Sequence, residues 1–144
     1  MSPAQAPRSS VRRQPVLVAN GQGFWGDSIL GPIRLLREGP LHYLTLDYLA
    51  EVTMSIMQKL RARSPKGGYA TDFVKLIDRV LPELVAKEVR VVANAGGVNP
   101  LACKDAVLEV FARHRLRGVR VAVVEGDDER LGGEGGRLRQ ARGE

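Results

Sequence analysis

The chain has 144 residues, 44% of them hydrophobic and 26% charged, which is enough for one domain with a hydrophobic core and too little for two. Its net charge of +6 is spread along the chain, and the densest basic run, from Arg113 to Arg120, contains no aromatic side chain. Because nucleic-acid-binding modules combine basic residues with stacking platforms or groove-reading motifs, this composition argues against nucleic-acid binding.

The two ends of the chain differ in composition from its centre. Residues 1–15 hold three arginines with no apolar segment behind them, so we expect a disordered basic tail and no secretory signal. Residues 129–144 are rich in glycine and arginine, and we expect them to be disordered as well. The folded domain is therefore expected to span residues 16–128.

No stretch of the sequence approaches the roughly 20 consecutive apolar residues that a transmembrane helix needs, so we expect no membrane association. Cys103 is the single cysteine, which excludes an internal disulfide framework and suits a reducing compartment. We therefore expect a cytoplasmic protein.

Short apolar runs alternate with longer helical patterns, which is typical of β-α units around a parallel sheet. We expect strands at residues 16–20, 43–46, 89–93 and 119–124. The helices expected between and after them begin near Asp27, Leu49, Thr71 and Asn99. These elements predict an α/β, Rossmann-like three-layer fold with a four-stranded parallel sheet in the order 2-1-3-4.

Three of the expected helices carry clear signals. An apolar stripe of the second helix is expected to lie on the sheet, and it consists of Leu49, Val52, Ile56 and Leu60. The third has the most regular period, with apolar residues at 73, 76, 77, 80, 81, 84 and 85, and its Pro82 predicts a kink or a division. Asn99 followed by Pro100 predicts the start of the fourth, as N-cap and first helical residue.

A glycine-rich turn follows the first expected strand, with the spacing Gly21-x-Gly23-x-x-Gly26. Glycines at these positions allow a tight turn, a close approach of backbone N–H groups to a ligand, and close packing of a helix. Asp47 ends the next expected strand, where a dinucleotide fold binds a ribose hydroxyl. Against that interpretation, Phe24 and Trp25 add bulk to the turn and Asp27 adds negative charge where a phosphate would bind.

Several segments of the sequence resemble the acyclic terpene utilisation AtuA-type family. They lie, in family order, at residues 24–27, 44–51, 68–73, 94–100 and 126–128. The resemblance covers roughly residues 16–128 and implies a place in the bacterial breakdown of acyclic terpenoids such as citronellol and geraniol, whose later steps use acyl-CoA thioesters. Family members are considerably longer, so the resemblance also implies that this chain is the N-terminal portion, truncated before a missing C-terminal domain.

Ligands of open parallel sheets bind beyond the carboxyl ends of the strands, where the strand order reverses. In the predicted order, two glycine turns meet at such a reversal, with carboxylates on either side. We assign proton transfer to Asp47 and Glu51. Ligand binding is assigned to Asn20, Gly21, Gly23, Phe24, Trp25, Gly26, Asp27, Asn94, Gly96, Gly97, Asn99, Asp127 and Asp128.

Each of these assignments has a structural alternative that the sequence leaves open. Gly96 and Gly97 can serve only to begin a helix, and the two aromatic residues of the first turn can fill the core. Glu51 can complement the positive end of a helix, and Asp127 and Asp128 can be solvated loop residues.

Cysteine, histidine and carboxylate residues give no clear metal site. Cys103 and His114 fall on the apolar stripe of the fourth helix, which favours a buried structural thiol and a packing histidine. His42 opens a strand and has no evident partner, and with two histidines and one cysteine the usual zinc and iron sites are not expected. A Mg²⁺ site built from Asp27, Asp47 and Asp127 stays open, and no cofactor is identified.

Three hypotheses for function result. The first is an AtuA-type protein that binds or acts on a branched acyl or terpenoid intermediate, the substrate class being implied by the resemblance. The second is a nucleotide-binding, NAD-type oxidoreductase domain, based on the glycine spacing and Asp47. The third is a non-catalytic fragment or assembly module, in which an incomplete sheet forms an oligomer or binds the missing domain.

Overall fold

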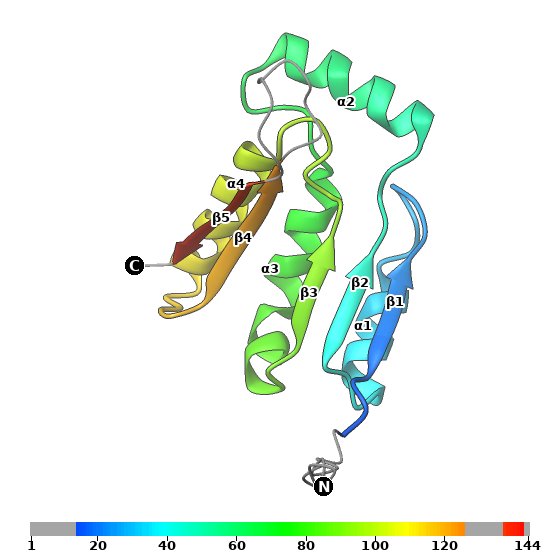
Figure 1. The fold of residues 1–144 in the computed structure, drawn as a ribbon, viewed down its shortest axis with the longest axis vertical. Coiled ribbons are helices and arrows are strands. Elements are labelled where there is room, and N and C mark those ends of the chain that lie inside the picture. The colour runs from blue at the N-terminus through cyan, green and yellow to red at the C-terminus, as the bar shows by residue number, and fades with distance from the viewer. Residues whose placement is uncertain (1–13, 126–136, 143–144) are drawn as a thin grey trace, which may run out of the picture.

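The computed structural model describes residues 14–125 and 137–142 (Figure 1). Asp127, Asp128, most of the N-terminal tail and part of the C-terminal tail lie outside the described residues. The described elements are, in chain order, β1 (Val18–Gln22), α1 (Leu30–Glu38), β2 (Tyr43–Leu46), α2 (Glu51–Arg63), α3 (Thr71–Ala86), β3 (Arg90–Ala93), α4 (Pro100–Arg113), β4 (Arg120–Glu125) and β5 (Arg137–Arg142).

The three strands β1, β2 and β3 form a parallel sheet in the order β1-β2-β3. Ala19 is paired with Leu44, and Leu44 with Val91, so the three strands are in lateral register. The expected order, in which the first strand separates the second from the third, is therefore wrong. The alternation of apolar residues identifies strands but carries no information on which strands are neighbours.

The helices α1, α3 and α4 form one layer behind the strands (Figure 1), and α3 packs between the other two. Connections between parallel strands are right-handed, so strands that are added in one direction across a sheet place their helices on the same face. A second helix layer requires a reversal of strand order, which these strands lack. The described residues thus form two layers, in place of the three that we expected.

The fourth strand does not join the parallel sheet. β4 contacts α4, but its hydrogen bonds go to β5 in an antiparallel pair, with Val121 opposite Ala141. The expected four-stranded parallel sheet is therefore reduced to three strands. β5 lies inside residues 129–144, the segment for which we expected no regular structure.

The core lies between the parallel sheet and the helix layer. The apolar stripe of α3 is buried as its period predicts, through Leu76, Ile77, Val80, Leu81 and Leu84. Pro82 does not divide this helix. Leu36 of α1 and Val110 of α4 are fully buried against the same core cluster. Among the described helices, none is long and apolar enough to cross a bilayer.

α2 departs from the predicted packing. Instead of lying on the sheet, it crosses the molecule beyond the carboxyl ends of the strands (Figure 1). Only Met57 of this helix is buried, whereas Val52 is 70% exposed and Ile56 42% exposed. Val52, Ile56 and Leu60 of the expected stripe therefore form a solvent-facing apolar surface, whereas Leu49 packs against the core.

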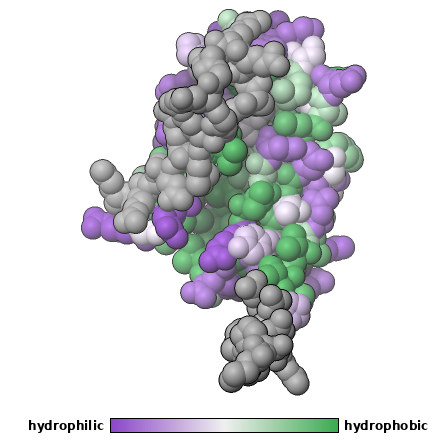
Figure 2. Space-filling view, viewed as in Figure 1, coloured by the Kyte–Doolittle hydropathy of each residue, from purple (hydrophilic) through white to green (hydrophobic). Residues whose placement is uncertain are grey.

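Among the described residues, no helix covers the other face of the parallel sheet. Val18, Asn20, Tyr43 and Val92 have their side chains on this open face, alternating with core residues along each strand. Val18 is 60% exposed and Val92 is 55% exposed. Figure 2 shows this side of the molecule, with hydrophobic residues gathered over the strands and polar residues among them. Because parallel sheets are usually covered on both faces, this surface is an unusual feature.

Candidate functional site

Asp47 and Asn94 meet at the carboxyl edge of the parallel sheet. Asp47 follows β2 and Asn94 follows β3, and neighbouring parallel strands bring residues at their ends together. Asn94 Nδ2 donates to Asp47 Oδ1 at 2.6 Å, and Asn94 Oδ1 accepts from the backbone N–H of Tyr48 at 2.7 Å. Two residues that are far apart in the sequence are thus held in one polar pair, and both are exposed.

The surroundings of Asp47 favour its ionised form. The hydrogen bond from Asn94 lowers the pKa of this carboxyl group below its usual value, and the backbone N–H of Leu49, 3.2 Å from Oδ1, lowers it further. A carboxylate with a lowered pKa is a weak base at neutral pH. It is a good acceptor for a hydroxyl or another polar hydrogen, so the geometry suits ligand orientation better than proton abstraction.

Gln22, at the end of β1, is a buried polar residue that the sequence pattern did not single out. The ladder between β1 and β2 shifts at Gly21, so that Asn20 pairs with Thr45 and Gln22 with Leu46. This bulge turns Gln22 toward the core side, where the residue is 3% exposed. Its Nε2 donates to the carbonyl of Asp27 at 3.2 Å, but its buried Oε1 has no hydrogen-bond partner among the described residues. A period-two pattern cannot show a bulge, so the inward position of Gln22 was not predictable from the alternation of residue types.

The loop between β1 and α1 is closed by its own side chains. Asp27 Oδ2 accepts from the backbone N–H of Gly23 at 3.1 Å, and Asp27 Oδ1 accepts from Ser28 at 2.7 Å. α1 begins only at Leu30, whereas we expected it to begin near Asp27. The glycine turn therefore does not lead directly into a helix N-terminus, which is the geometry that a dinucleotide fold uses to bind a pyrophosphate.

The glycines of this turn meet three different environments. A Cβ on Gly21 would lie 2.7 Å from Pro32 Cβ, so this position is required for close packing of β1 against α1. Gly26 has a φ of +94° and nothing close to it, which is a conformational requirement. Gly23 has neither constraint and faces open space.

The second predicted turn is tied to the α2–α3 loop. A Cβ on Gly96 would lie 2.8 Å from Pro100 Cβ, and one on Gly97 would overlap the sulfur of Met57. Asn99 is the N-cap of α4, accepting from Ala102 N, and its Nδ2 donates to the carbonyls of two loop residues, Pro65 at 2.8 Å and Gly67 at 2.7 Å. These three predicted ligand residues thus have packing or capping contacts that account for their identity.

The remaining predicted residues are spread around this edge. Phe24 is 56% exposed, whereas Trp25 is partly buried and packs against the core cluster. Glu51 is exposed in the first turn of α2, where it complements the helix dipole. Asn20 lies on the open face of the sheet and accepts a hydrogen bond from Thr45 Oγ1 at 3.2 Å.

Buried side chains beneath this edge include a tyrosine and the single cysteine. Tyr48 is fully buried with its ring edge-on to Phe73, and its hydroxyl has no hydrogen-bond partner among the described residues. Burial raises the pKa of the Cys103 thiol to about 12, so it is present as an unreactive thiol. His114 is exposed and contacts Asp78 at 2.7 Å, which lowers the pKa of Asp78. It therefore makes a surface hydrogen bond in place of the packing contact that we expected.

Within the described part of the chain, no three His, Cys, Asp or Glu side chains are grouped to hold a metal ion. Asp27 uses both carboxylate oxygens within its own loop, and Asp127, the third residue of the possible Mg²⁺ site, lies outside the described residues. The exposed groups at this edge that can hold a ligand are therefore the hydrogen-bonding side chains of Asp47 and Asn94, whereas Gln22 is buried.

A comparison with protein-family models gives a match. A family model described as "Acyclic terpene utilisation family protein AtuA" matches residues 16–132, which is most of the chain. No curated protein matches, and no solved structure matches.

Proposed function

Because the chain belongs to the AtuA family of acyclic terpene utilisation proteins, we propose that it binds a branched acyl or terpenoid intermediate at the carboxyl edge of its parallel sheet. The observation that carries this proposal is the exposed Asp47–Asn94 pair, joined at 2.6 Å between the central strand and its neighbour. The pair offers an ionised acceptor whose orientation is fixed by an amide.

The ligand that suits these groups has a polar end and an apolar body. Asp47 accepts a hydrogen bond from a ligand hydroxyl or amide, and Asn94 keeps the carboxylate in place. The exposed side chains of Phe24 and of Val52 and Ile56 on α2 supply apolar surface beyond the same edge of the sheet. A terpenoid chain with an oxygenated end combines both chemical features.

In this proposal, Asp47 orients the ligand and does not act as the base. Its lowered pKa supports this role, because an effective general base at neutral pH has a pKa close to 7. Proton transfer by Glu51 stays a prediction. Binding of an acyl-CoA thioester, as opposed to the free acid or alcohol, is part of the same proposal and is tested with it.

Fluorescence provides the test, because Trp25 is the single tryptophan and lies in the loop after β1. We expect citronellol and the CoA thioester of its acid to change Trp25 emission in a saturable manner. Asp47→Asn should weaken that binding about tenfold, which corresponds to the loss of roughly 1.4 kcal/mol from one charge-assisted hydrogen bond. Asp72→Asn, in the first turn of α3, is the matched control.

A flat titration with every ligand, together with no increase in the thermal midpoint, would remove the proposal. Titration with NADH under the same conditions tests the nucleotide-binding alternative. Saturable quenching by NADH, lost in Asp47→Asn, would favour an oxidoreductase domain over the terpenoid-binding protein.

A further inference from the structure

The open face of the parallel sheet carries opposite charges at its two ends. Near the amino ends of the strands, Val18, Tyr43 and Arg90 are paired side by side across the sheet. At the carboxyl ends, Asp47 and Asn94 directly follow β2 and β3, and both lie on the same face by the alternation of exposed and buried residues. Among the described residues on this face of the three strands, Arg90 is the cation of one end and Asp47 the anion of the other.

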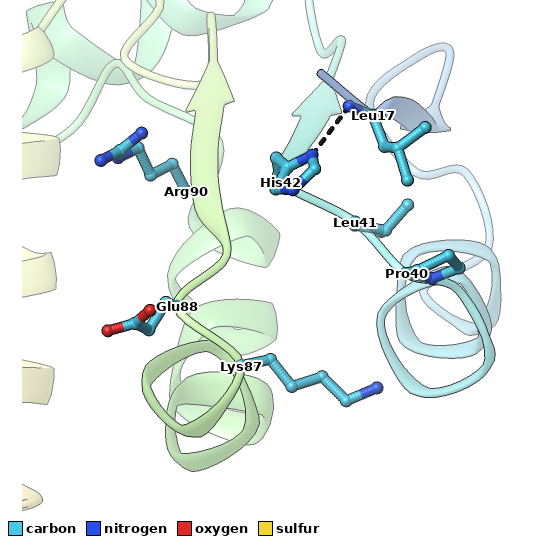
Figure 3. Close-up of a pocket in the computed structure, with 7 residues that line it drawn as sticks. All are labelled: Leu17, Pro40, Leu41, His42, Lys87, Glu88 and Arg90. Carbon is cyan, nitrogen blue, oxygen red and sulfur yellow. Dashed lines mark hydrogen bonds between the residues drawn. The ribbon is translucent and has the colours of Figure 1, made fainter. Parts of the chain in front are cut away.

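Both charged groups are anchored on the face and open to a partner. Arg90 Nη1 donates to the hydroxyl of Tyr43 at 2.9 Å, and its guanidinium lies 5.5 Å from the centroid of that ring. Figure 3 shows its side chain extending from β3 on the side away from Lys87 and α1, and a guanidinium has further N–H donors to offer. At the other end, the hydrogen bond from Asn94 lowers the pKa of Asp47 and keeps the ionised carboxylate beside β3.

The middle of the face carries no charge. Asn20, Thr45 and Val92 are paired across it. Thr45 Oγ1 donates to Asn20 Oδ1 at 3.2 Å, so part of the hydrogen-bonding capacity of these residues is met within the face. The exposed side chain of Val92 stands beside them. Contact with a second surface would therefore bury apolar area at the centre without burying an unpaired charge.

A two-fold axis that passes through this middle row, perpendicular to the strands, makes the face complementary to itself. Such an axis places the amino end of one face against the carboxyl end of the other and leaves each strand opposite its own copy. Arg90 then faces the Asn94–Asp47 pair of the second copy, and Val92 faces its own counterpart. Facing sheets pack about 10 Å apart, a distance that an arginine and an aspartate side chain span together.

We infer that the open face is an interface between two copies of this chain, packed with their strands antiparallel and joined by two Arg90–Asp47 ion pairs around Val92. A second copy is the occupant that fits, because this one face supplies both partners of each ion pair. Three short strands form an interface at the small end of specific complexes, so we expect half-dimerisation at roughly 10 µM to 1 mM protein. The inference does not rest on the proposed function, although both use Asp47, because association is measured without ligand.

Charge reversal gives a test that a two-fold pairing passes and a non-specific contact fails. Arg90→Asp produces a face with two negative ends, and Asp47→Arg produces one with two positive ends. Each variant alone should be monomeric in sedimentation velocity at concentrations where the parent protein is dimeric. An equimolar mixture of the two should form a heterodimer, because every negative end then meets a positive one. The double variant Arg90→Asp/Asp47→Arg should dimerise as the parent does.

A milder variant tests the same contact with less risk to the fold. Arg90→Gln should weaken dimerisation about tenfold, since it removes two symmetric ion pairs, whereas Arg79→Gln on the exposed surface of α3 should leave dimerisation unchanged. Arg90→Gln keeps the Asp47–Asn94 pair, so its citronellol titration reports on the proposed function alone.

Far-UV circular dichroism first confirms that both reversal variants are folded. A parent protein that stays monomeric at about 1 mM would overturn the inference. Dimers of both reversal variants, a mixture of folded reversal variants that stays monomeric, or unchanged dimerisation of Arg90→Gln would each overturn it as well.

Discussion

The glycine turn after β1 permits a sharp test, because its three glycines are required for different reasons. Gly21→Ala would bring a Cβ to 2.7 Å from Pro32 Cβ and 2.9 Å from Pro32 Cα, and neither atom can rotate away. Overpacking of this kind costs about 1–3 kcal/mol. Gly26→Ala has open space around it but must adopt a φ of +94°, which costs about 1–2 kcal/mol for a residue with a side chain.

Gly23→Ala is the matched control for both variants. No heavy atom lies within 4 Å of its Cβ position, and its φ lies outside the left-handed region. The expected effect is between neutral and about 1 kcal/mol stabilising, because alanine restricts the unfolded chain.

Urea unfolding, followed by far-UV circular dichroism and by Trp25 emission, measures the free energy of unfolding of each variant. In thermal unfolding, the differences should correspond to about 4 °C for each kcal/mol in a domain of this size. If Gly23→Ala is as destabilising as Gly21→Ala, the distinction between packing and open positions is wrong. The turn would then be constrained in the way that a dinucleotide fold requires.

Three further predictions concern the site and its surroundings. Removal of the amide in Asn94→Ala should raise the Asp47 pKa toward 3.8, as measured by carboxyl NMR. The folded-state pKa of Asp47 lies below its unfolded value, so the interaction with Asn94 stabilises the fold above about pH 4. This stabilisation is lost as the pH falls through the folded-state pKa. Asn94→Ala should therefore lose less stability than the parent protein on acidification. Cys103, with its pKa raised to about 12, should react with Ellman's reagent at pH 8 only in denaturant, and fast labelling of the folded protein would contradict its burial. The uncovered sheet face should cause concentration-dependent self-association in light scattering, and Val92→Lys should reduce it, whereas a monomer at every concentration would refute this expectation.

Local features were predictable where a single element determines them. The cap at Asn99 and the stripe from Leu76 to Leu84 follow from contacts within one helix and from the face it buries, and both are confirmed. The family was also predictable, because its motifs are short contiguous segments, and the match over residues 16–132 confirms it.

Features that depend on which elements are neighbours could not be read in the same way. The stripe on α2 has the same period as that on α3, yet only the latter faces the core, since period alone does not say whether a partner layer exists. The Asp47–Asn94 pair required two strands to be adjacent, which the predicted order did not provide. Gln22 depended on a bulge, which leaves no trace in the alternation of residue types.

The strand order has a consequence for how the protein is made. Each strand of the parallel sheet pairs with the strand that precedes it along the chain, so no strand has to be inserted between two that are already joined. As the polypeptide leaves the ribosome, β1 and β2 can dock as soon as α1 has formed, and β3 then joins an existing edge. The first closure spans residues 23–42 and the second spans residues 47–89, and neither requires a strand to thread between two strands that are already paired.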